Sequence, residues 1–491
     1  MPAAPGDPLV QSYNDVPYTS APDPARHPDR LATIGMLMGV DVTPVATSRV
    51  LELASGDGAN LVAIAATLPH ATFVGFDFAA VPVARAQQMV RELALANVQI
   101  HELDLRAVPA DFGTFDYIIA HGLYSWIPAD VRAGVMPLIA RHLARNGIAL
   151  VSYNALPGGH LRSVVRDMLL YHTRNVAGKA EKVAAARTLL DLVGTAVEDD
   201  GPAQQAMRAE VRSAAQGSDA SLAHDDLSEP NQPFYFHEVI ADAGRAGLTF
   251  LAEARLDAAL AHGVAPNVQQ ALARLDRLTR EQYVDFVHFR HFRESLLCHA
   301  GLRASVRLQP ARVRQLYAVP SLALRRAASP NVRAADRLQP IDPLEQRVLA
   351  RWPQCVAIAE LADCDDARVG NAQRDRATAF DEHIVALHAA GRIDLRTEPV
   401  GVAAAAGERP EAFGAARFIS RERDVIPSLY HEALRYPDPL ARKLLALLDG
   451  TRTRDEIGAA VGGPFVGPTG RVQLDRALRV LASKALLVER P

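Results

Sequence analysis

The strongest chemical signal in this chain is a glycine-rich turn between a short apolar run and a helical stretch. It spans residues 52–60 and reads Glu-Leu-Ala-Ser-Gly-Asp-Gly-Ala-Asn. Gly56 and Gly58 let the backbone approach a ligand closely, and the start of the following helix offers free N–H groups. Ala54 is small enough to permit the same approach. By itself this turn predicts a ligand site without identifying the ligand.

Acidic residues end the next two apolar runs. Asp77 lies 20 residues after Asp57, and Asp104 with Leu105 ends the run after that. A carboxylate at the first position can accept both hydroxyls of a ribose, and the second position would meet an adenine edge. Because the carboxyl ends of parallel strands face one crevice, we expect an adenosine-containing ligand there. The residues expected to bind it are Glu52, Ala54, Gly56, Asp57, Gly58, Asn60, Asp77, Asp104, Leu105, His121 and Gly122.

Two alternatives explain part of this pattern. Asp77 and Asp104 would also serve as caps of the segments that follow them. A dinucleotide such as NAD also uses a glycine turn and an acidic residue, but its motif is G-x-G-x-x-G, and Asp57 would repel a diphosphate. A cationic sulfonium ligand tolerates Asp57.

Alternating strand-like and helix-like segments must position these residues. Apolar runs predict strands at 49–54, 72–77, 98–104, 115–121 and 148–154, and the intervening segments predict helices at 61–68, 82–96 and 129–145. The alternation predicts an α/β fold with a doubly wound, parallel, Rossmann-like sheet.

Later segments extend this pattern. A helix over 233–247 and a strand over 248–254 would add to the sheet. Residues 160–215 are helical with no strand signal, and 279–299 fit one amphipathic helix. Residues 303–337 are rich in arginine and predict a solvated linker.

The turn and the acidic positions resemble the motif series of class I S-adenosylmethionine-dependent methyltransferases. More particular segments resemble bacterial members with a methyltransferase regulatory domain, including rickettsial-type protein lysine methyltransferases. These segments are 13–18, 121–128, 151–158, 233–236 and 290–297. Two departures are Ala54, where a glycine is usual, and Gly159-His160, where relatives often place Trp after Pro-Gly. The resemblance implies S-adenosylmethionine as cofactor, a winged-helix C-terminal part and a homodimer.

An amine acceptor must lose its proton near a cationic sulfonium, which an aromatic, dehydrating pocket favours. We expect this pocket after the fourth and fifth strands, closed by the N-terminal arm, although any of these aromatic residues could instead belong to the core. The residues assigned to it are Tyr18, Tyr124, Trp126, Tyr153 and Asn154.

The C-terminal third repeats a pattern of helices, a small turn and a short apolar strand, which predicts two winged-helix-like units. The last helix, near 474–485, is only weakly basic, so a protein partner is favoured over sequence-specific nucleic acid. Since the crevice is predicted within the first 160 residues, deletion of 401–491 should leave cofactor binding intact.

The expected organisation has five parts. They are an arm over 1–30, a methyltransferase core over 31–160 whose sheet 230–255 would complete, a helical regulatory domain over 161–305, a linker with a first winged-helix-like unit over 306–400, and a second unit over 401–491. The formal charge of −3 argues against a uniformly basic nucleic-acid binder. Three cysteines without ligand spacing, no leader pattern and no membrane span predict a cytoplasmic protein.

The sequence thus predicts an S-adenosylmethionine-dependent methyltransferase acting on lysine side chains of a protein substrate. A methyltransferase for a small amine or hydroxyl metabolite is the first alternative. A cofactor-sensing module that binds DNA or protein is the second.

Overall fold

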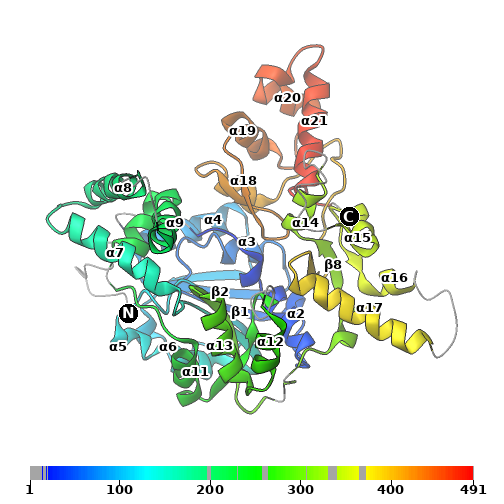
Figure 1. Ribbon diagram of the computed structural model, residues 1–491. Coiled ribbons are helices and arrows are strands. Elements are labelled where there is room, and N and C mark those ends of the chain that lie inside the picture. The colour runs from blue at the N-terminus through cyan, green and yellow to red at the C-terminus, as the bar shows by residue number, and fades with distance from the viewer. Residues whose placement is uncertain are drawn as a thin grey trace.

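The computed structural model describes residues 14, 18, 20–195, 201–228, 230–256, 264–302, 304–305, 307–329, 340–363 and 372–489 (Figure 1). Its centre is a seven-stranded sheet in the order β3-β2-β1-β4-β5-β7-β6. The strands are β1 (Arg49–Leu53), β2 (Thr72–Asp77), β3 (Val98–Glu102), β4 (Phe115–Ala120), β5 (Leu143–Asn154), β6 (Leu248–Glu253) and β7 (Phe292–His299). The five predicted strands and the sixth over 248–254 are confirmed.

The sheet is mixed, not wholly parallel as the sequence predicts. Strands β3, β2, β1, β4 and β5 pair in parallel, whereas β7 is antiparallel to both β5 and β6. The single amphipathic helix expected over 279–299 is therefore wrong in its second half. Helix α13 (Arg277–His288) ends at Phe289, which has a left-handed backbone (φ 50°), and β7 follows.

Helices cover both faces of the sheet. Alternate residues of the strands point to opposite sides, so Val50 joins the buried cluster beneath α2 and α3, while Leu51 joins the cluster beneath α6 and α11. The helices of the first face are α2 (Pro28–Leu37), α3 (Leu61–Ala65) and α4 (Ala80–Glu92), and those of the second are α6 (Val135–His142) and α11 (Phe236–Arg245). A short helix, α5 (Ala129–Arg132), precedes α6, and α12 (Pro266–Ala273) precedes α13.

The predicted arm ends earlier than residue 30. A 3-10 turn covers Pro24–Arg26, and α2 begins at Pro28, because both prolines occupy a first-turn position where no N–H is needed. Residues 1–13 of the predicted arm lie outside the described residues.

A separate group of helices follows β5, as predicted for 160–215. It consists of α7 (Gly159–Thr173), α8 (Lys179–Thr195) and α9 (Pro202–Gln216). Val165, Leu169, Leu190 and Val211 belong to a small buried cluster of its own. Figure 1 shows these helices in cyan and green beside the carboxyl ends of β1 and β2.

The predicted solvated linker over 303–337 contains ordered structure. Strand β8 (Tyr317–Pro320) pairs with β9 (Val356–Ala357) and β10 (Ile393–Arg396). Its arginines have acidic partners far along the chain: Arg314 binds Asp381 at 2.9 Å, and Arg325 binds Glu432. Long-range ion pairs and buried apolar residues, which local composition does not reveal, account for the difference.

Helices surround these three strands and continue to the C-terminus. They are α14 (Leu322–Ala327), α15 (Pro343–Arg351), α16 (Ile358–Asp363), α17 (Ala372–Ala389), α18 (Gly414–Ile419), α19 (Pro439–Leu447), α20 (Arg454–Val461) and α21 (Gly470–Ser483), with a hairpin of β11 (Val425–Pro427) and β12 (Ala433–Arg435) after α18. Thr453 and Glu456 form the capping box at the start of α20. The winged-helix assignment of these units stays a prediction. None of the described helices is long and apolar enough to cross a bilayer.

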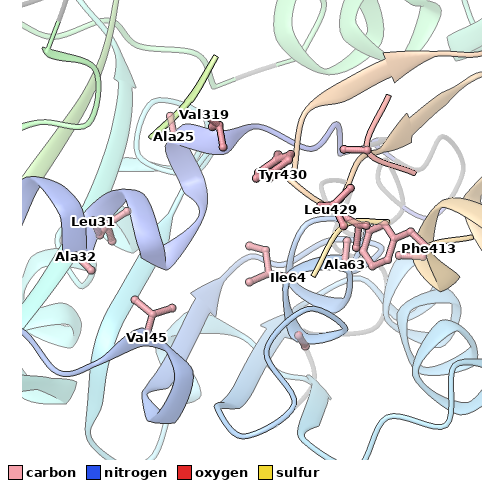
Figure 2. Packing of buried hydrophobic residues seen from close by; sticks show 14 of the residues in the cluster. Ala25, Leu31, Ala32, Val45, Ala63, Ile64, Val319, Phe413, Leu429 and Tyr430 are labelled. Carbon is pink, nitrogen blue, oxygen red and sulfur yellow. The ribbon is translucent and has the colours of Figure 1, made fainter. Parts of the chain in front are cut away.

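The C-terminal part is packed directly on the sheet domain. Figure 2 shows Phe413, Leu429 and Tyr430 near Ala63 and Ile64 of α3, and all five belong to one buried cluster. The core is therefore continuous between the α/β domain and the C-terminal third.

A buried arginine holds β7 in the sheet. The side chain of Arg293 is fully inaccessible and donates to both carboxylate oxygens of Asp285 at 2.9 Å, to Glu253 and to the carbonyl of Glu281 at 3.0 Å. The Cζ atom of its guanidinium lies over the Phe236 ring, 4.1 Å from the ring centroid. Burial of this charge is tolerated because the carboxylates surround it.

We expect Arg293→Met to lower the free energy of unfolding by about 3–5 kcal/mol, since it leaves buried carboxylates without their cation. Denaturant titration followed by circular dichroism measures the change. Arg435→Ala is the control, because Arg435 forms an exposed ion pair with Asp424 and should cost less than about 1 kcal/mol. Equal losses in the two variants would contradict the role given to Arg293.

Candidate active site

The turn after β1 has the backbone that its glycines predict. Ala54, Gly56 and Gly58 have φ values of 54°, 54° and 71°. A Cβ atom on Gly58 would lie 2.7 Å from the Cβ of Ala86 on α4, so this turn and α4 approach each other more closely than a side chain allows. Ala54 holds a conformation that costs a non-glycine residue energy, as is common at ligand sites.

Asp77 joins the ends of β1 and β2. Its carboxylate accepts the N–H of Gly56 at 3.0 Å and the N–H of Ala79 at 3.0 Å. Burial raises the pKa of Asp77 to about 6, against these hydrogen bonds, which lower it. The capping role considered for Asp77 is thus present, and it coexists with a position in the crevice.

Asp104 caps the turn that follows β3. Its carboxylate accepts the N–H of Arg106 at 2.8 Å and pairs with the guanidinium of the same residue at 2.6 Å. These hydrogen bonds lower the pKa of Asp104. Leu105 begins the 3-10 turn Leu105–Ala107.

A cavity of about 830 Å³ opens at the carboxyl ends of the first four strands. Ala54, Asp77, Asp104 and Leu105 of the predicted set line it together with Phe76 and Phe78. Its other wall consists of Leu123, Ile127, Pro128, Asp130, Val131, Leu170, Thr173, Arg174, Lys179, Lys182, Ala223, Leu227, Ser228 and Pro230. The volume, the apolar walls and the buried carboxylate of Asp77 suit an adenosine group.

Glu52 on β1 and Asn60 at the start of α3 flank the turn and are joined by a hydrogen bond. The amide of Asn60 donates to Oε1 of Glu52 at 2.8 Å. Burial raises the pKa of Glu52 to about 8. Oε2 of Glu52 and Oγ of Ser55 are buried and have no hydrogen-bond partner within the described part of the chain. Such atoms fit a polar ligand group, because an unpaired buried polar atom is costly.

His121 and Gly122 follow β4. Nδ1 of His121 lies 3.7 Å from Oε1 of Glu294, and burial lowers the pKa of this imidazole. The N–H of Gly122 donates to Oγ of Ser152 at 2.9 Å, and its φ is 65°. Neither residue lines the cavity, so both stay predicted cofactor residues.

Asp57 is engaged by arginines. Its inaccessible carboxylate pairs with Arg423 from the C-terminal part and lies 3.9 Å from Nε of Arg85 on α4. It also accepts the N–H of Ala59 at 3.2 Å. The carboxylate of Asp57 is therefore neutralised by the protein's own cations.

The predicted aromatic pocket is not assembled as one group. Tyr124 and Tyr153 are buried, and their ring centroids lie 6.3 Å apart. Both hydroxyls have partners: that of Tyr124 donates to Asp242 at 2.6 Å, and that of Tyr153 lies 3.3 Å from Oγ of Ser295. These two fit the core alternative stated for them. Neither lines the cavity.

Trp126, Tyr18 and Asn154 have different surroundings. Nε1 of Trp126 is buried without a hydrogen-bond partner among the described residues. Tyr18 is 37% exposed, and its hydroxyl lies 3.5 Å from Asp225. The amide of Asn154, at the end of β5, donates to Asn231 at 2.9 Å. Of the predicted set, Trp126 offers an unused donor near the carboxyl ends of the strands.

Sequence reasoning missed the basic cavity wall from α7 and α8. Lys179 and Lys182 are two of only four lysines in the chain, and both line the cavity with Arg174. The scarcity of lysine was a usable signal, because a residue type that is rare elsewhere stands out where it gathers. The contacts from the C-terminal part were also missed, and they had no local signal.

Two family models match the chain. A methyltransferase domain matches residues 50–147, and a predicted methyltransferase regulatory domain matches residues 218–299. The second range contains α11, β6, α12, α13 and β7, so the regulatory match supplies two strands of the same sheet. The range expected as a separate helical domain is therefore divided between an inserted helical group and the sheet.

Similar curated proteins come from Rickettsia prowazekii (strain Madrid E). The uncharacterized protein RP028 is 30% identical over 233 residues, which are 47% of this chain and 93% of that protein. The uncharacterized protein RP789 is 37% identical over 293 residues, 59% of this chain, and the match spans about half (53%) of that protein's length.

A solved structure is similar over almost the whole chain. The structure of PKMT2 from Rickettsia typhi covers 96% of this chain and 100% of its own, with a TM-score of 0.83 and 22% identity. The same protein in complex with AdoHcy gives a TM-score of 0.81. These findings establish the class I methyltransferase fold, and the methyltransferase domain implies S-adenosylmethionine as cofactor.

We expect Gly58→Ala to destabilise the protein by about 1–3 kcal/mol, because the new Cβ meets Ala86 and the backbone has a positive φ. Thermal unfolding measures the change. Gly244→Ala on α11 is the matched control: no atom lies within 4 Å of its Cβ position, so it should be neutral or stabilising by up to about 1 kcal/mol. A stable Gly58→Ala protein would contradict the close packing of this turn.

Proposed function

Because the chain belongs to the family of RP028 and carries a methyltransferase domain with a regulatory domain, we propose that it methylates lysine side chains of a protein with S-adenosylmethionine. The observation that carries this proposal is the fold similarity to PKMT2, a protein lysine methyltransferase, over the accessory parts as well as the core. The size of the C-terminal third favours a macromolecular acceptor over a small metabolite.

The residues at the crevice fit the methyl donor. Asp77 provides a buried carboxylate for ribose hydroxyls, and Phe76, Phe78 and Leu105 provide apolar walls beside an adenine. The unpartnered Oε2 of Glu52 and Oγ of Ser55 suit the polar amino-acid end. When bound, the donor would supply its methyl group to the lone pair of a neutral amine: the N–C bond forms as the S–CH3 bond breaks, S-adenosylhomocysteine leaves as a neutral thioether, and the methylated ammonium releases one proton to solvent.

The chain's own contribution is to hold a neutral amine in a dry, oriented position. Well-oriented reactants can save about 7–11 kcal/mol of barrier, so a strong catalytic base is not required. Trp126, after β4, and Asn154, the last residue of β5, are the aromatic and polar groups assigned to the acceptor side, whereas His121 is assigned to the cofactor. Tyr124 and Tyr153 support this edge from the core, as their bound hydroxyls require.

We expect Asp77→Ala to weaken binding of S-adenosylmethionine about a hundredfold or more, since it removes two hydrogen bonds to a charged acceptor that contribute about 1.5–3 kcal/mol each. Isothermal calorimetry measures the affinity. Asp130→Ala is the matched control, because Asp130 lines the same cavity from the exposed helix α5 and should change affinity little. Unchanged affinity in Asp77→Ala, or tighter binding of NAD by the wild type, would refute the donor assignment.

We expect methyl label from the donor to appear on lysine Nε of protein when the enzyme is incubated with a bacterial lysate. Acid hydrolysis and amino-acid analysis identify the methylated residue. A lysate whose lysine amines have first been acetylated, so that no nucleophilic lone pair remains on Nζ, is the control and should take up almost no label. Label that stays on protein in the blocked lysate would refute a lysine acceptor. Label only in small molecules would favour a metabolite acceptor.

A further inference from the structure

The C-terminal part reaches the turn after β1 through one segment, residues 414–435, which contains α18, β11 and β12. Arg423 of this segment pairs with Asp57, and Arg421 pairs with Glu92 at the end of α4. A Cβ on Gly414 would lie 3.0 Å from Leu93. The segment is therefore packed on the turn after β1 and on the end of α4.

A hydrogen-bonded relay runs from this segment to β1. Nε2 of His431 lies 2.8 Å from Oδ1 of Asn60, and Nδ2 of Asn60 lies 2.8 Å from Oε1 of Glu52. An amide oxygen only accepts, so His431 donates from Nε2, and the Asn60 amide then donates to Glu52. The three residues are 2%, 2% and 6% exposed, so water does not compete for these bonds.

The backbone around His431 holds its ring in place. His431 has a φ of 61°, which is costly for a residue with a side chain. Oγ of Ser428 accepts the N–H groups of Tyr430 at 3.2 Å and of Glu432 at 3.1 Å, and the Ser428 carbonyl accepts the N–H of His431 at 2.9 Å. The turn therefore fixes the direction of the imidazole.

The relay ends at a carboxyl group with one unused oxygen. Oε1 of Glu52 is bound by Asn60, whereas Oε2 is buried and has no partner in the described ranges. Oγ of Ser55, three residues later, is in the same state. The orientation of Oε2 follows from the Asn60 bond, because a carboxyl group held at one oxygen cannot rotate freely.

We propose that His431 is a positioning residue of the donor site: through Asn60 it orients Glu52 toward the amino-acid end of the bound methyl donor. This inference rests on the proposed function. It also replaces the expectation that deletion of 401–491 leaves donor binding intact, because the deletion would remove both His431 and Arg423.

The test compares two ligands on three variants by calorimetry. S-adenosylhomocysteine has the amino-acid end, and 5′-methylthioadenosine lacks it. We expect His431→Ala to weaken binding of S-adenosylhomocysteine about tenfold or more, with 5′-methylthioadenosine affected less than about twofold. His431→Gln should restore most of the affinity, since the amide of Gln can donate from nearly the same place. Ala, Gln and His all meet the same energetic cost of the positive φ, so this cost does not distinguish the variants.

Arg421→Ala is the matched control. It removes the ion pair between Glu92 and the half-exposed side chain of Arg421, in the same segment as His431, and leaves the contacts of Asn60 and Asp57 in place. The affinities for S-adenosylhomocysteine and for 5′-methylthioadenosine should both stay unchanged. If His431→Ala does not fold, His431→Gln against His431→Asn carries the comparison, because Asn is too short to reach Asn60. Weaker binding for Asn alone would support the relay, and equal binding would overturn it.

The remaining outcomes are also decisive. Unchanged binding of S-adenosylhomocysteine in folded His431→Ala, or equal loss for both ligands, would overturn the positioning role. Failure of the wild type to bind either ligand would overturn the proposed function, and the inference with it.

Discussion

The buried guanidinium of Arg293 is the interaction on which the arrangement of the sheet depends. It neutralises Asp285 on α13 and Glu253 at the end of β6, and so ties β7 to this helix and to this strand. Because β7 is antiparallel, its first residues lie at the carboxyl edge of the parallel strands, opposite Asn154. The region matched as regulatory thereby contributes Glu294 to the same edge as His121.

The local sequence pattern predicted the structure correctly where neighbouring residues determine it. Apolar runs and the glycine turn identified six strands and the Asp77 position. A buried strand requires consecutive apolar residues and a positive φ favours glycine, so both can be recognised from neighbouring residues in the sequence. The seventh strand was missed because Arg293 and Glu294 look like the exposed face of a helix, whereas their burial depends on partners that include Glu253, 40 residues from Arg293. Asp57 and Asn60 were placed correctly at the turn, but their partners are 366 and 371 residues away and leave no local signal.

The buried carboxylates around the turn after β1 form two groups that differ in where their hydrogen-bond partners come from. Asp77 and Asp104 face the cavity, where their hydrogen bonds come from nearby backbone groups. Glu52 and Asp57 instead depend on side chains of other elements. The adenosine side is thus built by the α/β domain and by helices α7 and α8, whereas the other side is shared with the C-terminal segment.

The ring of His27, before α2, lies 5.8 Å from that of His431, and Arg30 pairs with Asp394. Contacts between such distant parts of a chain carry a large loop-closure cost and form late in folding. During synthesis the α/β strands leave the ribosome well before residue 431 does. A nascent chain whose sheet is complete therefore still lacks the side chains of His431 and Arg423 at the turn after β1.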